Sequence, residues 1–184
     1  VAGATDFATP VKPINNFIDR WHSLVDRVLK RPGPHRIGVV GAGAGGMELL
    51  LAVQFRLGNL LAEQGQSTDD LEFHLIFRSE TILPDFSGGV RRKFERLLDL
   101  RGVHLHNNAV ASQVAPGVLS LTDGKTIALD EILWVTAAGA PSWPRESGLE
   151  VDGAGFIKVR DTLQSITHDD IFAAGDIAAV VNHP

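Results

Sequence analysis

Hydrophobic positions recur with two different periods along this chain, one typical of helices and one typical of strands. Between residues 13 and 30 they return every three or four positions, which predicts an amphipathic helix. The breaker at residues 31–34 would end this helix, and residues 1–10 would precede it as an extended segment. The apolar face of the predicted helix consists of Ile14, Phe17, Ile18, Trp21, Leu24, Val25 and Val28.

Short strand patterns, the first of them a β-branched run at residues 36–40, then alternate with helical patterns. Strands are predicted at residues 36–40, 71–77 and 103–107, with helices between them at residues 45–64 and 87–100. Strands that alternate with helices in this way favour a parallel sheet with right-handed crossovers.

The pattern changes after residue 109. Three short strands are predicted at residues 110–114, 118–121 and 126–129, separated by Pro-Gly and Asp-Gly turns. They would form a β-meander that replaces one crossover helix. Buried strands are predicted after it, at residues 132–137 and 171–174.

These elements predict an α/β fold, a Rossmann-like parallel sheet with helices on both faces and a β-meander crossover. We expect the main domain to span residues 35–140. Residues 1–34 would be an N-terminal segment and helix that belong to a neighbouring domain or a linker. Residues 141–184 would return into that neighbouring domain, of which the chain would hold only part.

Composition narrows the class of function. Of the 184 residues, 44% are hydrophobic, which suffices for a sizeable core, and the net charge of −5 argues against a nucleic-acid partner. The chain has no cysteine, which excludes disulfides, thiolate zinc sites and a redox dithiol within it. Any electron transfer here would therefore run through a bound cofactor. No apolar run approaches the roughly 20 residues that cross a bilayer.

A glycine cluster follows the first predicted strand of the main domain and opens the next helix. Its sequence, Gly41-Ala42-Gly43-Ala44-Gly45-Gly46, satisfies the G-x-G-x-x-G pattern of dinucleotide-binding loops. In that pattern the first glycine permits a tight turn, the second lets the backbone approach a pyrophosphate, and the third lets helix and strand pack closely. Free N–H groups at the helix start would then hold the phosphates. The alternative is a turn that serves only the strand–helix junction.

The end of the second strand bears on the choice of nicotinamide cofactor. An acidic residue there would accept from the ribose 2′-hydroxyl of NAD, whereas an arginine would suit the 2′-phosphate of NADP. This strand ends in Phe77-Arg78 without the acid, so the sequence leaves NAD and NADP both open. A solvated surface arginine is the alternative interpretation of Arg78.

Other groups of residues give weaker indications of function. His104 and His106 lie two apart in a predicted strand and share one face, but no third metal ligand is apparent, so we expect no metal. No G-x-S-x-G elbow is present, which leaves hydrolase chemistry without support. The pattern predicts no catalytic acid–base residue.

Several motifs resemble a known family in their order along the chain. Residues 43–48 resemble the G-x-x-G-x-E of pyridine nucleotide–disulfide oxidoreductases, and residues 134–139 resemble their "ATG" segment. Residues 155–159, 162–164 and 171–176 resemble their terminal flavin signature. Within that superfamily the chain is most similar to type II NADH dehydrogenases, in the branch sometimes fused to selenide water dikinase.

The resemblance implies an FAD-dependent oxidoreductase that passes hydride from NAD(P)H to FAD and then to an acceptor such as a quinone. It implies that the loop glycines face the cofactor pyrophosphate, with Glu48 near the nicotinamide–flavin contact and Ala138 and Gly139 beside the cofactor. Gly175 and Asp176 would contact FAD, with the carboxylate accepting from a flavin hydroxyl. The alternatives are a helix first-turn acid for Glu48 and a helix N-cap for Asp176.

The chain departs from the family in that it contains a single glycine loop and lacks the earlier loop that binds the FAD adenylate. It also has no cysteine, which disfavours the disulfide reductases and the sulfide–quinone reductases. We therefore expect a fragment that carries the NAD(P)-binding domain. A nucleotide-sensing module without redox activity is the alternative function. We expect a cytoplasmic location, with peripheral attachment to the inner membrane as an option for the full-length protein, and the sequence leaves a homodimer open.

Overall fold

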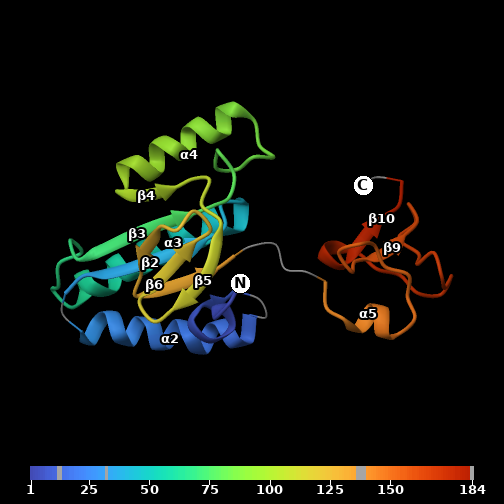
Figure 1. Ribbon diagram of the computed structural model, residues 1–184, viewed down its shortest axis with the longest axis horizontal. Helices are drawn as coiled ribbons and strands as arrows, with labels where there is room; N and C mark the ends of the chain where they lie inside the picture. Colours follow the sequence, from blue (N-terminus) through green and yellow to red (C-terminus); the bar gives the residue numbers. More distant parts are fainter. Residues whose placement is uncertain (12–13, 32, 136–139, 183–184) are drawn as a thin grey trace. The chain divides into compact units, whose positions relative to one another are not determined.

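The computed structural model describes residues 1–11, 14–31, 33–135 and 140–182. The chain forms two compact units, Val1–Thr136 and Ala137–Pro184 (Figure 1). The first unit contains the parallel sheet and the long helices, and the second contains short strands and turns. The two units are therefore described separately.

The first unit is built on a five-stranded parallel sheet. Its strands are β1 (Thr9–Pro10), β2 (His35–Val40), β3 (Leu71–Ile76), β4 (Val103–His106) and β8 (Glu131–Trp134), in the order β1-β8-β2-β3-β4. All four neighbouring pairs are parallel. The four longer strands confirm the predictions from hydrophobic runs, whereas the two-residue β1 was too short to leave a periodic signal.

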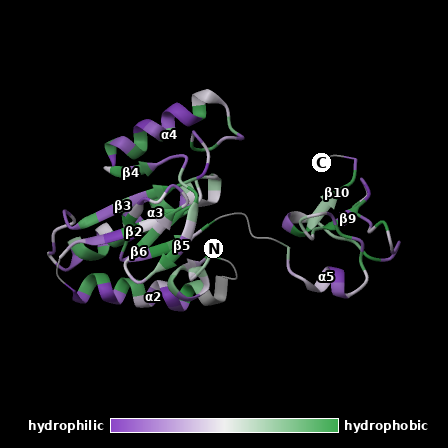
Figure 2. Ribbon diagram, in the orientation of Figure 1, coloured by the Kyte–Doolittle hydropathy of each residue, from purple (hydrophilic) through white to green (hydrophobic). Residues whose placement is uncertain are grey.

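Three long helices cover one face of this sheet, α2 (Ile14–Lys30), α3 (Ala44–Glu63) and α4 (Gly88–Leu100). α4 begins after Ser87, whose hydroxyl accepts a hydrogen bond from the Val90 N–H. In Figure 2, α2 and α4 alternate between hydrophilic and hydrophobic stretches, as amphipathic surface helices do. The core between helices and sheet contains Leu24, Val28, Ile37, Val39, Met47, Leu50, Phe73, Leu75, Leu98 and Leu133.

The predicted β-meander lies on the opposite face of the sheet. It consists of β5 (Ala111–Ala115), β6 (Val118–Leu121) and β7 (Thr126–Ala128), and the one-turn helix α1 (Ala4–Phe7) joins it there. A Cβ at Gly38 in β2 would lie 2.5 Å from the Leu129 Cδ1, so the meander packs directly onto the strand backbone. The α/β class is thus confirmed, and the meander covers the face that a crossover helix would otherwise cover.

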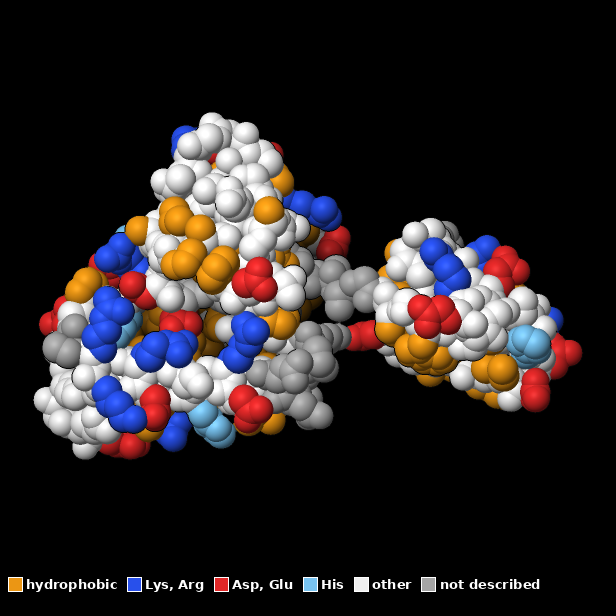
Figure 3. Space-filling model, turned by 60° about the horizontal axis from the view of Figure 1, so that its bottom comes forward, with side chains coloured by type: hydrophobic (Ala, Val, Ile, Leu, Met, Phe, Trp, Pro, Cys, Tyr) orange, Lys and Arg blue, Asp and Glu red, His pale blue; other side chains and the backbone are white. Residues whose placement is uncertain are grey.

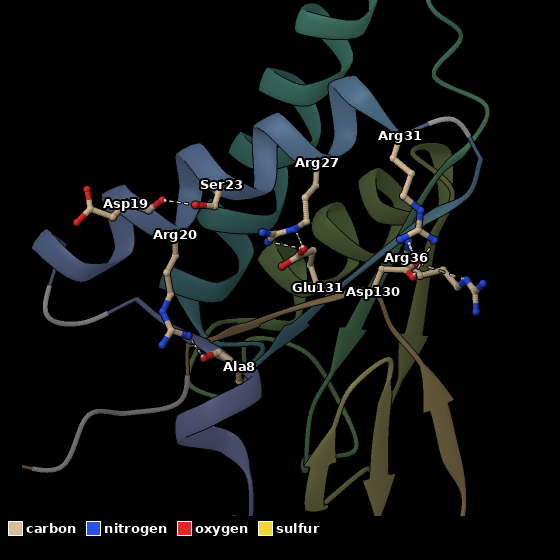
Figure 4. A network of polar contacts seen from close by, with 9 residues as sticks. All are labelled: Ala8, Asp19, Arg20, Ser23, Arg27, Arg31, Arg36, Asp130 and Glu131. Atoms are coloured by element: carbon tan, nitrogen blue, oxygen red, sulfur yellow. Dashed lines mark hydrogen bonds and ion pairs between the residues drawn. The ribbon is translucent and has the colours of Figure 1, made fainter.

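The N-terminal segment, expected in a neighbouring domain or a linker, packs on the sheet of the first unit. α2 buries Leu24 and Val28 in its core, and its arginines tie the helix to the start of β8 and to the residue before β1 (Figure 4). Arg27 pairs with Glu131, and Arg20 donates to the Ala8 carbonyl at 2.6 Å. Figure 3 shows Lys and Arg side chains on this side of the unit, around a hollow with hydrophobic and acidic side chains.

The second unit is small. Its elements are α5 (Trp143–Glu146), β9 (Ile157–Val159), the 3₁₀ turn η1 (Gly175–Ile177) and β10 (Ala178–Val180), which pairs with β9 in parallel. Its core consists of Leu149, Ile157, Val159 and Ala173.

The strand predicted at residues 171–174 is wrong for this structure. Within those residues only Phe172 pairs, in an isolated bridge with Gln164, and its side chain is 62% exposed. A buried strand needs cover on its faces as well as paired neighbours, and Ile171 and Phe172 stay exposed although Ser165 donates to the Ile171 carbonyl.

Candidate functional site

The glycine loop lies at the point where the order of strands in the sheet reverses. From β2 the chain proceeds to β3 and β4 on one side, and later returns to β8 on the other side of β2. Val135, directly after β8, donates to the Val40 carbonyl, and its Cγ1 lies 3.8 Å from where a Cβ at Gly45 would be. In open parallel sheets the crevice at such a switch point is the usual place for a ligand.

Two glycines of the loop are required by the fold itself. Gly41 has a φ of 120°, a conformation that residues with a Cβ rarely adopt. A Cβ at Gly46 would lie 1.9 Å from the Gly41 carbonyl oxygen, so α3 can approach β2 this closely only without a side chain there. These two positions fit the first and third roles of the G-x-G-x-x-G pattern.

Gly43 differs from both. Its φ is −76°, which any residue can adopt, and a Cβ there would have no atom within 4 Å. It is the N-cap of the 20-residue helix α3, and no side chain caps this helix end. Its carbonyl accepts from Met47, the first N–H that the helix can pair, so Ala44, Gly45 and Gly46 precede the intrahelical ladder. The loop thus offers open space and N–H donors at the positive end of a helix dipole.

The end of β3 and the segment after it are hydrogen-bonded to the glycine loop. Gly41 donates to the Ile76 carbonyl at 2.9 Å, and the Ala42 carbonyl accepts from the Leu83 N–H at 2.9 Å. The second of these bonds could not be predicted from the sequence, because it joins residues 41 apart that have no shared motif.

The two residues that follow β3 differ in burial. Phe77 is buried in the core beside α3, and its backbone N–H and carbonyl bond to His106 and Ala109. Arg78 is exposed, so it is the residue of this pair whose side chain is accessible to a ligand. Glu48 lies on α3 and is exposed as well.

The remaining predicted site residues fall elsewhere. Ala138 and Gly139 lie outside the described residues. Gly175 and Asp176 belong to the second unit, in the turn η1. Gly175 has a φ of 72°, and a Cβ there would have no atom within 4 Å.

His104 and His106 share one face of β4 and meet a third histidine from β3. The ring of His74 lies 4.8 Å from that of His104 and 5.3 Å from that of His106, and its Nδ1 is 3.0 Å from the His106 Nε2. Burial, followed by the charges of the other two rings, lowers the pKa of His74 to about 4. Burial also lowers the pKa of His106. Burial thus favours the neutral forms of His74 and His106.

His74 was missed in the sequence because its place opposite His104 depends on the strand register. Across the described residues, no group of three or more His, Cys, Asp or Glu side chains is arranged to hold a metal ion. In the same part of the chain, no helix is long and apolar enough to cross a membrane.

Comparison with curated proteins gives relatives of one kind. The chain is 30% identical over 149 residues to a type II NADH:quinone oxidoreductase from Haemophilus influenzae, covering 79% of this chain and 33% of that protein. It is 24% identical to the NADH dehydrogenase-like protein YutJ from Bacillus subtilis over all 184 residues, which cover 47% of that protein. The chain therefore spans about a third to a half of these relatives.

The fold also matches solved structures. NDH2 from Plasmodium falciparum, determined in complex with NADH, superimposes with a TM-score of 0.79 at 16% identity, covering 97% of this chain and 41% of that one. This match confirms the Rossmann-like class. Residues 2–184 match the pyridine nucleotide-disulphide oxidoreductase family, as the order of sequence motifs predicted. The chain belongs to the pyridine nucleotide-disulphide oxidoreductase family.

Proposed function

We propose that this chain is the NAD(P)H-binding portion of an FAD-dependent oxidoreductase. In the whole protein, hydride would pass from NAD(P)H to FAD and then to an acceptor such as a quinone. The family assignment supports the reaction class, and the names of relatives that act as NADH:quinone oxidoreductases support the donor and the acceptor.

The observation that carries the proposal is the glycine loop at the switch point of the sheet. Gly43 leaves the space that a pyrophosphate would take, and the uncapped start of α3 supplies N–H donors with a positive dipole end. Gly41 and Gly46 allow the turn and the close packing that bring these donors together. The residues present therefore fit a dinucleotide.

The other predicted contacts have separate roles. The exposed Glu48 on α3 would lie near the nicotinamide end of the cofactor, and Ala138 and Gly139 would lie beside it. In the second unit, Gly175 and Asp176 would contact FAD. When bound, FAD supplies the two-electron acceptor for the nicotinamide hydride, while this chain positions the donor and excludes water. No acid–base side chain is needed for that transfer.

Location and assembly follow from the proposed acceptor. A quinone is found in a membrane, so an oxidoreductase in the cytoplasm that uses it would work at the membrane periphery. A homodimer is compatible with this function.

Substituting Gly43 tests the proposal. We expect Gly43→Val to weaken NADH binding to the 184-residue chain by about a hundredfold, because the side chain would fill the space for the pyrophosphate. The melting temperature should change by less than about 2 °C, since a Cβ at this position meets nothing within 4 Å. Isothermal titration calorimetry and thermal melting measure the two effects.

Gly46→Val is the matched control from the same loop. It should abolish folding as well as binding, because its Cβ would overlap the Gly41 carbonyl. A folded Gly43→Val chain with unchanged NADH affinity would contradict the proposed function.

A further inference from the structure

Leu83 occupies an unfavourable backbone conformation beside the glycine loop. Its φ is 47°, in the left-handed region that residues with a Cβ generally avoid. Its side chain is 2% exposed, and its N–H donates to the Ala42 carbonyl at 2.9 Å. Strained residues of this kind persist only where the surrounding structure fixes them, and they concentrate at functional sites.

Several contacts fix Leu83. Its side chain belongs to the apolar core that also contains Ile82, Leu98 and Ala42. Its carbonyl accepts from the Phe86 N–H at 3.0 Å, which closes a turn after Leu83. The side chain therefore acts as the anchor that keeps the N–H aimed at the glycine loop.

The bond to Ala42 also orients the next residue of the loop. In a trans peptide, the carbonyl of one residue and the N–H of the next lie in one plane and point in opposite directions. Holding the Ala42 carbonyl toward Leu83 therefore turns the Gly43 N–H to the other side of the loop. Gly43 is the residue at which the loop is open, since a Cβ there meets nothing within 4 Å.

We propose that Leu83 is a positioning residue for dinucleotide binding, which sets the Gly43 N–H to donate to the cofactor pyrophosphate. This inference rests on the proposed function and adds a specific residue to it. The ligand class is any nucleotide that carries a pyrophosphate, so NADH and ADP-ribose should depend on Leu83 to the same degree.

The test compares two neighbouring buried residues in the 184-residue chain. Leu83 and Ile82 are 2% and 1% exposed, so Leu83→Ala and Ile82→Ala should lower the melting temperature by similar amounts. We expect only Leu83→Ala to weaken NADH and ADP-ribose binding, by about tenfold, the effect of one charge-assisted hydrogen bond. Leu83→Met, which keeps the side-chain volume, should restore affinity. Equal losses in Leu83→Ala and Ile82→Ala would overturn the proposal.

Amide hydrogen exchange tests the same bond without a substitution. Coupling between binding and the Leu83–Ala42 bond is reciprocal, so NADH should slow exchange of the Leu83 amide. The Gly102 amide, which bonds to Asp99 in the turn after α4, should respond less. Equal slowing of both amides would overturn the inference, whereas failure of the unchanged chain to bind NADH would overturn the proposed function itself.

Discussion

The two units of this chain reach stability by different means. The first unit buries a parallel sheet between three long helices and a β-meander, with an extensive apolar core on each face. The second unit has a core of four residues and leaves Phe172 and Trp143 more than half exposed. Small domains bury a smaller share of their surface and are correspondingly marginal.

The same difference separates the glycine loop, which is proposed to bind NAD(P)H, from the residues that are predicted to contact FAD. Every described part of the proposed dinucleotide site lies in the first unit, at the ends of strands and the start of the long helix α3. The predicted flavin contacts Gly175 and Asp176 lie in a three-residue turn of the second unit. We infer that the first unit holds the pyrophosphate of the nicotinamide cofactor through its glycine loop, and three experiments can break or sharpen this contrast.

The largest expected effect is on the second unit. Val159 in β9 and Val39 in β2 are both fully buried, so Val159→Ala and Val39→Ala each remove the same two methyl groups from a core. Each should cost about 2 kcal/mol. We expect this loss to abolish amide protection in the second unit, whereas the first unit should tolerate it. Hydrogen exchange followed by mass spectrometry measures both.

The two units have separate apolar cores that share no residue, so Val159→Ala should leave the exchange of β2 and β3 unchanged. NADH affinity should also stay within about twofold of the unchanged chain, because the glycine loop belongs to the first unit. A drop in first-unit protection would show that the two units depend on each other.

The second effect is a pH dependence confined to the first unit. The pKa of His74 is about 4 in the fold, below its ordinary value, so the unfolded chain binds the proton more readily. This contribution to stability is present above about pH 6.5 and is lost as the pH falls toward 4. Glu72 opposes the shift, while burial, His104 and His106 cause it.

We expect the free energy of unfolding of the first unit to fall by about 1–2 kcal/mol between pH 7 and pH 4 from this cluster, after allowing for solvent screening. Urea denaturation at several pH values measures it, and His74→Gln should flatten the curve. If the free energy of unfolding depends on pH in the same way in the His74→Gln variant and in the unchanged chain, groups other than His74 cause the dependence.

The smallest effect concerns the choice of cofactor within the first unit. The exposed Arg78 follows β3, where a 2′-phosphate would lie, and guanidinium groups bind phosphate well. We expect Arg78→Ala to weaken NADPH binding by about three- to tenfold and to leave NADH within about twofold. Arg56 is also exposed but lies on α3, so Arg56→Ala is the control and should change neither the NADPH affinity nor the NADH affinity. If the ratio of NADPH affinity to NADH affinity is unchanged in Arg78→Ala, then Arg78 is a surface residue without a role in cofactor choice.

Most helices and strands of the first unit could be predicted because hydrophobic residues recur along them with the period of a helix or of a strand. The helices at residues 14–30, 44–63 and 88–100 each bury one apolar face, and the longer strands of the sheet are short hydrophobic runs. The second unit was harder to predict, since its structure depends on turns and isolated bridges. An apolar run such as Ile171-Phe172-Ala173-Ala174 resembles a buried strand whether or not a sheet is there to receive it.

The same division applies to the site. Gly41, Gly43 and Gly46 could be found from spacing because their roles are local to one strand–helix junction. Val135 and Leu83 could not, since their contacts with the loop depend on strand order and on a turn without a motif. His74 likewise requires the register of β3 against β4.

The two-residue strand β1 has a consequence for the behaviour of the protein in concentrated solution. An open strand edge invites pairing with another molecule, which is one route to aggregation. Thr9 and Pro10 occupy the edge beside Leu133 and Trp134 of β8, and proline has no N–H with which to recruit a further strand. Residues 9 and 10 therefore disfavour strand pairing between two molecules at this edge of the sheet.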